Sequence, residues 1–288
     1  MRPSRLQWRN TDMTLLATVA NDPDHMPSLL FALDKELSIT DARPGSAWGI
    51  GYHAEDRALT IHKPAELVAR KGVYGVAPNI RSRILLACNQ RPEPPLTALD
   101  RAPPHRFRRW LFACRGELRG LEGVRGRVRE KLPDFLGLEL GDGAVSELAF
   151  AIFLAELRRD GVLDDPLATV EGQRTACARA MDAISTLMAD TGNGGGVPAA
   201  FALSNGRTLI LSRGSAPLFY REQHGLDRPA EGPLDPARTD FNDLAQALKR
   251  FRAVILASGP SVGEGWSPIP EGATAAIDLQ LQWSWPTA

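Results

Sequence analysis

The chain has 288 residues, of which 43% are hydrophobic and 24% charged, and its 34 basic and 34 acidic side chains leave no formal net charge. This composition is typical of a globular protein and excludes a disordered or membrane-embedded one. A balanced charge also excludes the long-range attraction that draws proteins to nucleic acid or anionic lipid, so we expect neither a nucleic-acid nor a membrane partner.

Residues 1–13 and the three cysteines give expectations about the cellular compartment and about metal or cofactor binding. Residues 1–13 lack the apolar core of a signal peptide, and no stretch approaches the roughly 20 apolar residues of a membrane helix, which predicts a cytoplasmic protein. Cys88, Cys114 and Cys177 are odd in number and lack metal-ligand spacing, so we expect buried free thiols, no metal site and no cofactor.

Apolar patterning in the first half of the chain predicts mostly strands. TLLATVA is short, apolar and rich in β-branched residues, and AEDR resembles a turn between two apolar runs. The expected elements, in chain order, are a strand at 14–20, a helix at 26–37, a hairpin at 48–64, a short helix at 65–73, and strands at 83–88 and 108–114.

The second half predicts two helices followed by more strands. Residues 145–161 form the clearest amphipathic pattern, with apolar positions three and four apart and Gly161 as a C-terminal cap, and a second helix is expected at 175–190. Asn205-Gly206 predicts a hairpin within 198–214. Further strands are expected at 217–222, 253–259 and 275–283, and the order of elements favours an α+β layered domain.

Several of these segments, taken in chain order, resemble the segments of one known protein family. The landmarks are MTLLATVA (13–20), AWGIGYH (47–53), HKP (62–64), LLACNQ (85–90), RRWLFACRGEL (108–118), GAVSELAFAIFL (143–154), FALSNGRTLILSR (201–213) and VILASGPSVGEGWSPIPEGA (254–273). The ordered set resembles the class II glutamine amidotransferases, specifically the small stand-alone type.

The resemblance implies a four-layer αββα N-terminal-nucleophile sandwich, in which two antiparallel sheets lie between two helical layers. It covers residues 13 to 283, which gives an N-terminal extension at 1–13 and one amidotransferase-like domain at 14–288. On this basis we expect the segments 14–20, 83–88 and 110–114 to share one sheet, and the helix at 145–159 to pack on a sheet face.

The family's chemistry requires four groups. A cysteine at the mature N-terminus attacks the glutamine amide while its own α-amine acts as the base. An Asn-Gly pair forms the oxyanion hole. An arginine binds the substrate carboxylate in a bidentate manner, and an aspartate holds the substrate ammonium.

Each of these groups is replaced at the matching position of this chain. The family's Met-Cys falls on Met13-Thr14, which places a hydroxyl at the nucleophile position. Its His-Asn-Gly falls on Cys114-Arg115-Gly116, so the backbone donor remains and a cation replaces the amide.

The two substrate-binding positions are changed as well. The family's Ala-His-Ile-Arg falls on Ala87-Cys88-Asn89-Gln90, which puts a neutral amide in place of the arginine. Its Thr-Asp-Ser-Glu falls on Ala144-Val145-Ser146-Glu147, and valine cannot hold an ammonium. Trp48, Gly49 and Ile50 match the hairpin that lines the family's glutamine pocket, and are expected to line whatever pocket is left.

Several interpretations of single residues remain open. Thr14 is either an ordinary strand residue or a processed nucleophile. Arg115 either fills the emptied pocket and pairs with a carboxylate such as Glu117 or Glu147, or binds an anion. Cys88 and Cys114 are either buried thiols or a redox or metal pair.

The histidines give no further signal. His62 matches a structural landmark of the family. The other four, which include His105, lack metal or triad spacing, so we assign none of them a catalytic role.

Two functions from different classes follow. The first is a catalytically degenerate, glutaminase-inactive pseudoenzyme that acts as a binding or regulatory module for a small-molecule or anion ligand or for an unidentified protein partner. The second is a threonine-dependent N-terminal-nucleophile amidohydrolase, matured by cleavage between Met13 and Thr14. If the chain is an enzyme, the resemblance implies an amidohydrolase or amidotransferase.

Overall fold

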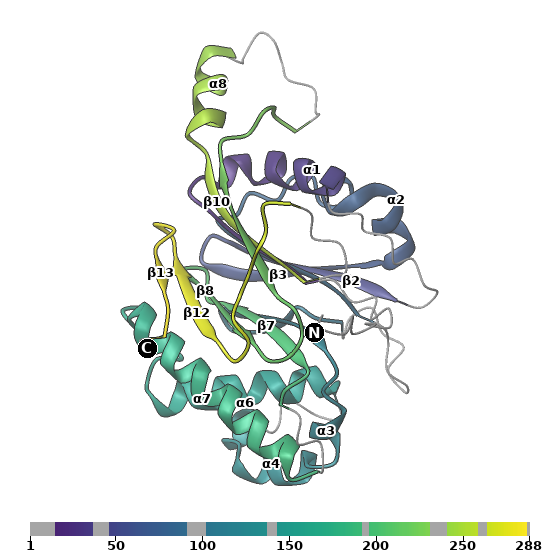
Figure 1. Ribbon diagram of the computed structural model, residues 1–288, viewed down its shortest axis with the longest axis vertical. Coiled ribbons are helices and arrows are strands. Elements are labelled where there is room, and N and C mark those ends of the chain that lie inside the picture. The colour runs from purple at the N-terminus through teal and green to yellow at the C-terminus, as the bar shows by residue number, and fades with distance from the viewer. Residues whose placement is uncertain are drawn as a thin grey trace, which may run out of the picture.

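The computed structural model describes residues 15–36, 46–90, 102–136, 143–191, 196–230, 241–258 and 264–286. Its elements form four layers, shown in Figure 1: α1 and α2 above, two facing sheets in the middle, and α6 and α7 below. Both sheets are antiparallel in every pairing found among these residues. The predicted α+β four-layer sandwich is therefore confirmed.

The first sheet contains seven described strands in the order β11-β9-β10-β1-β4-β2-β3. Its central strand β1 lies between β4 and β10, so the start of the chain's described part is at the middle of this sheet. The strands are β1 Leu15–Ala20, β2 Ala47–Ala54, β3 Arg57–Pro64, β4 Ile84–Gln90, β9 Phe219–His224, β10 Arg252–Ser258 and β11 Ser267–Pro268.

The second sheet has six described strands in the order β13-β12-β8-β7-β6-β5. The predicted hairpin at Asn205 is confirmed: its side-chain Oδ1 accepts hydrogen bonds from the N–H groups of Arg207 and Thr208, and Gly206 takes a positive φ of 87°. The strands are β5 His105–Phe107, β6 Trp110–Gly116, β7 Ala199–Ser204, β8 Thr208–Arg213, β12 Thr274–Asp278 and β13 Trp283–Ser284.

Helices cover the outer faces of both sheets. The covering helices are α1 Met26–Glu36, preceded by the short 3-10 helix η1 Pro23–His25, α2 Ala65–Val76, α3 Arg119–Glu122, α4 Arg125–Lys131, α6 Val145–Arg159 and α7 Val170–Ala189. A further helix, α8 Phe241–Arg250, projects from the top of the molecule in Figure 1. Thr169 caps α7 by accepting a hydrogen bond from the N–H of Gly172.

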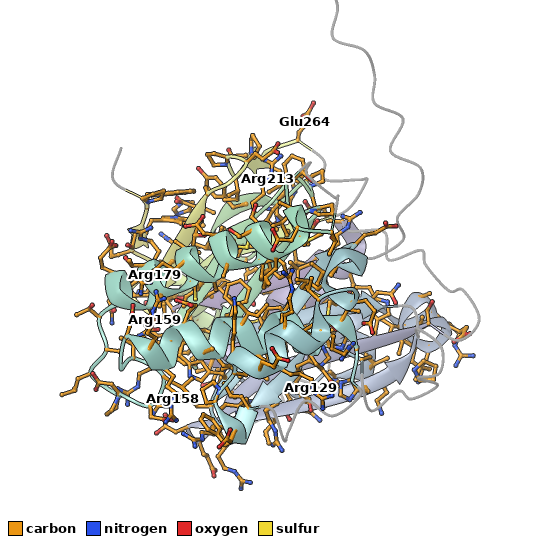
Figure 2. All side chains as sticks on the ribbon, turned by 90° about the horizontal axis from the view of Figure 1, so that it is seen from below. Arg129, Arg158, Arg159, Arg179, Arg213 and Glu264 are labelled. Atoms are coloured by element: carbon orange, nitrogen blue, oxygen red, sulfur yellow. The ribbon has the colours of Figure 1, made fainter. Side chains whose placement is uncertain are left out.

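The two long helices of the lower layer are joined by ion pairs as well as by apolar contact. Arg179 on α7 pairs with Asp160 and Glu156 at the C-terminal end of α6, and Arg159 also pairs with Glu156. Figure 2 shows Arg159 and Arg179 close together on this face.

Helix α2 bends at Gly72, which has a φ of 75°. The carboxylate of Asp34, on α1, accepts hydrogen bonds of 2.8 Å from the N–H groups of Val73 and Tyr74, which begin the second half of α2. Asp34 therefore caps that half and joins the two helices. Burial raises its pKa to about 6.

Three apolar clusters fill the spaces between the layers. One lies between the sheets, one between the first sheet and α1 and α2, and one between the second sheet and α6 and α7. Because strand side chains alternate, each buried strand contributes to two clusters. In β4, for example, Leu86 and Cys88 face the other sheet, whereas Leu85 and Ala87 face the helices.

One prediction about the sheets is wrong. The segments 83–88 and 110–114 were expected as strands of one sheet, but β4 belongs to the first sheet and β6 to the second. Both strands are apolar on both faces, so either sheet satisfies their hydrophobic pattern. They contact each other across the sandwich instead of through backbone hydrogen bonds.

Candidate functional site

Strands from both sheets meet where β1 begins. In the first sheet, Leu15 stands opposite Cys88 on one side and Ser258 on the other, and Cys88 in turn stands opposite Gly49. In the second sheet, β6 lies against the same end of β1, and we call this region the inter-sheet end. This is the place where the resemblance puts the nucleophile and the oxyanion hole.

Arg115 links the two sheets at this end. In β6, Ala113 faces the space between the sheets and Cys114 faces the helices, so alternation turns Arg115 toward the other sheet. Its Nη1 donates a hydrogen bond of 2.9 Å to the Oγ of Ser258, on β10. The hydroxyl of Ser258 donates in turn to the carbonyl oxygen of Pro217.

The arginine remains a cation in this position. Arg115 is only 6% exposed, and burial lowers its pKa to about 10, which still leaves the guanidinium protonated at neutral pH. Glu117 and Glu147 were expected as possible carboxylate partners of Arg115. The contact with Ser258 was not foreseen.

Cys88 and Cys114 come close to each other without a disulfide bond between them. Both are free thiols. Burial, and to a lesser extent the nearby Cys114 group, raises the pKa of the fully buried Cys88, although the backbone N–H of Cys114 opposes this by hydrogen bonding. A thiol held protonated in this way is a poor nucleophile and a poor metal ligand.

Two glycines allow the backbone to approach closely around this end. Gly116 has a φ of +126°, and a Cβ there would lie 2.1 Å from the carbonyl oxygen of Pro198. A Cβ at Gly49 would lie 2.0 Å from the carbonyl oxygen of Pro103. The Pro103–Pro104 segment therefore rests directly on β2, on the face that looks toward the second sheet.

The remaining residues of the predicted pocket do not gather at one point. Trp48 and Ile50 lie on the opposite face of β2, buried beneath α1 and α2. The indole Nε1 of Trp48 has no hydrogen-bond partner among the described residues. Thr14 and the side chain of Gln90 lie outside the described residues.

Helix α6 begins with Val145, which is in apolar surroundings, and Ser146, which forms a polar contact. Val145 is buried in the apolar cluster beneath the second sheet. The Oγ of Ser146 is hydrogen bonded to Nε2 of His105 at 2.8 Å, and Nδ1 of His105 lies 3.8 Å from Oε1 of Glu147. A hydroxyl, an imidazole and a carboxylate thus lie in a row.

His105 is held in the neutral form. Burial, with a smaller contribution from His62, lowers its pKa to about 3. Its ring is stacked over Phe112, which is stacked in turn over Phe150. The ring orientation is therefore fixed both by aromatic contact and by Ser146.

A cavity of about 290 Å³ lies beside His105. It is formed where the edge strands β3 and β5 lie next to each other and α6 passes beneath them. Its polar lining includes Thr60, His62, His105 and Glu147. Arg115, Cys88 and Gly49 are not among its described lining residues, but Pro104, which rests on β2 at Gly49, is one of them.

Sequence reasoning missed this arrangement of His105 and Glu147. His105 is about 40 residues from Ser146 in the chain, and no local spacing connects them. Glu147 lies in a segment that matches a landmark of the family (143–154), whereas His105 lies between two of them. Ser258 was missed for the same reason, because its contact with Arg115 spans 143 residues.

The described residues contain no group of three or more His, Cys, Asp and Glu side chains arranged to hold a metal ion. Within the same ranges, every helix is too short or too polar to cross a bilayer.

Solved structures resemble this chain in fold. A glutamine aminotransferase class-II domain protein from Silicibacter pomeroyi matches with a TM-score of 0.57 and 18% identity, over 95% of this chain and 98% of that one. A glutamine phosphoribosylpyrophosphate amidotransferase from B. subtilis, complexed with ADP and GMP, matches with a TM-score of 0.53 and 9% identity, over 95% of this chain and 48% of that one.

A third structure, an allosteric regulatory enzyme of purine biosynthesis, gives a TM-score of 0.52 at 10% identity, again over 95% of this chain and 48% of that one. Neither a family model nor a curated protein matches the chain by sequence. These likenesses show the fold that this chain shares with class II amidotransferase domains.

Proposed function

We propose that this chain is a catalytically degenerate class II glutamine amidotransferase-like protein, without glutaminase activity, that acts as a binding or regulatory module. The observation that carries the proposal is the position of Arg115. Its guanidinium lies between the sheets and is bonded to Ser258, at the position where the resemblance requires a neutral amide donor.

The oxyanion hole needs donors that are fixed in advance toward the oxygen on which negative charge develops. In this chain one Arg115 donor is committed to a hydroxyl on the opposite sheet. Loss of one such donor typically lowers turnover by about 10²- to 10³-fold.

Under this proposal, the binding of glutamine is weakened as well. Val145, at the position of the family's aspartate, is part of an apolar cluster. An ammonium placed against it would lose its hydration without gaining a charged partner. Gln90 replaces the arginine that would hold the substrate carboxylate, and an amide cannot supply the bidentate cationic contact.

The test is ammonia release from glutamine by the purified full chain, at enzyme concentrations high enough to detect very slow turnover. We expect no release above background. Arg115→Asn alone is not expected to restore activity, because the positions of Gln90 and Val145 remain changed.

The intact mass of the same preparation completes the experiment. The degenerate protein is expected to lack cleavage between Met13 and Thr14. Glutaminase turnover that disappears in Thr14→Ala, together with loss of the mass of residues 1–13, would refute the proposal in favour of the threonine-dependent amidohydrolase.

A further inference from the structure

A second cavity, of about 300 Å³, lies between helices α1 and α2, in the layer above the first sheet. The two helices pack against each other at the upper side of the molecule in Figure 1. All described lining residues belong to these helices, so none of them is shared with the cavity beside His105 or with the inter-sheet end. The volume is at the lower end of the range for small-molecule sites.

The break in α2 at Gly72 shapes this cavity. Gly72 has a φ of 75°, and a Cβ at this position would lie 2.1 Å from Oδ2 of Asp34. The carboxylate of Asp34 therefore rests directly on the backbone of α2, and the lack of a side chain at Gly72 leaves room for it. Both residues line the cavity, so the break brings a carboxylate into the cavity wall.

The carboxylate of Asp34 can accept further hydrogen bonds. Its Oδ1 and Oδ2 each accept one bond of 2.8 Å, from the N–H groups of Val73 and Tyr74, and a carboxylate has about four acceptor positions. Burial is the largest influence on the pKa of Asp34, and the two influences that oppose it are these backbone bonds. No cation in the described part of the chain pairs with Asp34, so an ammonium from a ligand would find a partly desolvated carboxylate without a counter-charge.

Positive charges lie on the same cavity. Arg70 and Lys71 line it, are exposed, and form no ion pair with an acid among the described residues. Glu66, the acid of α2, is one turn before Arg70 and does not pair with it. The guanidinium of Arg228 lies 5.4 Å from the centre of the Phe31 ring, which is also part of the lining. These cations repel a ligand that is only a cation and attract one that also carries a carboxylate.

The rest of the lining is apolar. It includes Phe31, Val68, Ala69 and the ring of Tyr74, and the two aromatic rings meet edge to face at 5.4 Å. A short apolar side chain would lose its hydration against this surface. The cavity thus combines an acceptor for an ammonium, cations for a carboxylate and an apolar wall.

We infer that this cavity binds a small zwitterion with an apolar body, such as an apolar α-amino acid, with its ammonium on Asp34 and its carboxylate at Arg70 and Lys71. The inference does not rest on the proposed function, because the cavity lies outside the inter-sheet end and glutamine hydrolysis is measured separately. It assigns a binding role to the break in α2.

The experiment compares three probes that have the same branched apolar body. Leucine carries both charged groups, isoamylamine lacks the carboxylate, and isocaproate lacks the ammonium. Each is titrated into the full chain near neutral pH, and binding is followed by NMR chemical-shift changes and by the rise in melting temperature that a native-state ligand causes. Leucine is expected to bind, with the largest shifts at the amides of Gly72, Val73 and Tyr74. The other two probes should bind at least about tenfold more weakly, because each lacks one charge-assisted contact.

Variants at the two charged ends then place the site. Asp34→Asn keeps the shape of the side chain and is expected to weaken leucine binding about tenfold or more. Asp182→Asn changes an exposed carboxylate on α7, in the opposite helical layer, and should leave binding unchanged. The double variant Arg70→Gln, Lys71→Gln should weaken leucine binding by a similar factor but leave the binding of isoamylamine equal or tighter.

A further pair of variants tests the cavity itself. Ala69→Leu fills the space and should abolish leucine binding. Lys131→Gln, which removes an exposed cation from α4, is the matched control for the double variant and should have no effect.

Leucine binding that is no tighter than that of isoamylamine or of isocaproate would overturn the inference, as would no leucine binding up to about 10 mM. Asp34→Asn also weakens the cap of the second half of α2. If it fails to fold, the double variant, which leaves the cap intact, decides the question, and unchanged leucine binding in it would refute the site. Leucine binding must also survive Arg115→Ala, since its loss would place the ligand at the inter-sheet end instead.

Discussion

Replacing His105 with glutamine is expected to remove part of the acid sensitivity of folding. In the folded protein His105 is 8% exposed, stacked on Phe112 and bonded to Ser146, and its pKa is about 3, compared with an ordinary value of 6.5. A glutamine side chain can form a hydrogen bond in place of the imidazole, but it has no ring that titrates.

The sign follows from proton binding. Between pH 6.5 and 3 the unfolded chain holds a proton at His105 that the folded chain does not, so acidification favours unfolding. The stability due to the neutral ring is complete above pH 6.5 and is lost progressively toward pH 3. At about 1.4 kcal/mol per pH unit, lowering the pH from 7 to 5 reduces the free energy of unfolding by about 2 kcal/mol.

Other groups titrate in the same range, so the comparison must be between variants. His53, whose pKa is lowered to about 4 mainly by burial, adds to the acid sensitivity. Asp34, whose pKa is raised to about 6, opposes it, since the folded state takes up its proton first. Both effects cancel when the same pH change is measured in wild type and in the His105 variant.

The assay is urea-induced unfolding at pH 7 and pH 5 for wild type, His105→Gln and His224→Gln. His224 is the matched control, because its side chain is 66% exposed. The loss of stability between the two pH values should be about 2 kcal/mol smaller in His105→Gln than in wild type and unchanged in His224→Gln. An equal loss in wild type and His105→Gln would refute the assignment of a buried neutral imidazole.

Two further predictions concern the inter-sheet end. Gly116→Ala should lower the free energy of unfolding, measured with urea, by about 2 kcal/mol or more, because it combines a strained positive φ with a collision against Pro198. Gly126→Ala is the control: its Cβ would meet open space, so this change should be neutral or stabilising by up to about 1 kcal/mol. Equal effects of the two changes would contradict the reasoning. A double-mutant cycle with Arg115→Met and Ser258→Ala should give a coupling of about 1.5 to 3 kcal/mol, as for a hydrogen bond to a charged group, and strict additivity would show that the bond contributes nothing.

The local elements were predictable where one residue pattern determines them. The helix expected at 145–161 is confirmed as α6, and its apolar face packs under the second sheet. The helix expected at 175–190 begins earlier, at Val170, because Thr169 provides the cap. Helix α8 was missed, although its apolar residues have helical spacing.

The pairing of strands was less accessible to sequence reasoning. The segment expected as one strand at 275–283 is two strands, β12 and β13, separated by a turn in which Asp278 accepts hydrogen bonds from the N–H groups of Gln280 and Gln282. Apolar alternation continues through such a turn, so the pattern alone does not reveal it. The placement of β4 and β6 in different sheets has the same origin, because partner choice is not encoded in the pattern of a strand buried on both faces.

The sequence predicted site residues only at positions that the family resemblance covers. It brought attention to Arg115, which is bonded to Ser258 opposite the start of β1, to its neighbour Gly116, and to Ser146 in the first turn of α6. It gave no reason to connect His105 with Glu147, since that contact depends on how an edge strand meets a helix. Side-chain geometry of this kind requires the folded chain.

The bond between Arg115 and Ser258 also has an evolutionary consequence. It is a cross-brace between the two halves of the sandwich, formed by the same side chain that occupies the proposed oxyanion position. Exchanging this arginine for asparagine would remove the brace, because the guanidinium that reaches Ser258 would be lost. Under the proposed function, a change at this position alone would therefore cost stability without restoring activity, so the brace would hold the arginine in place.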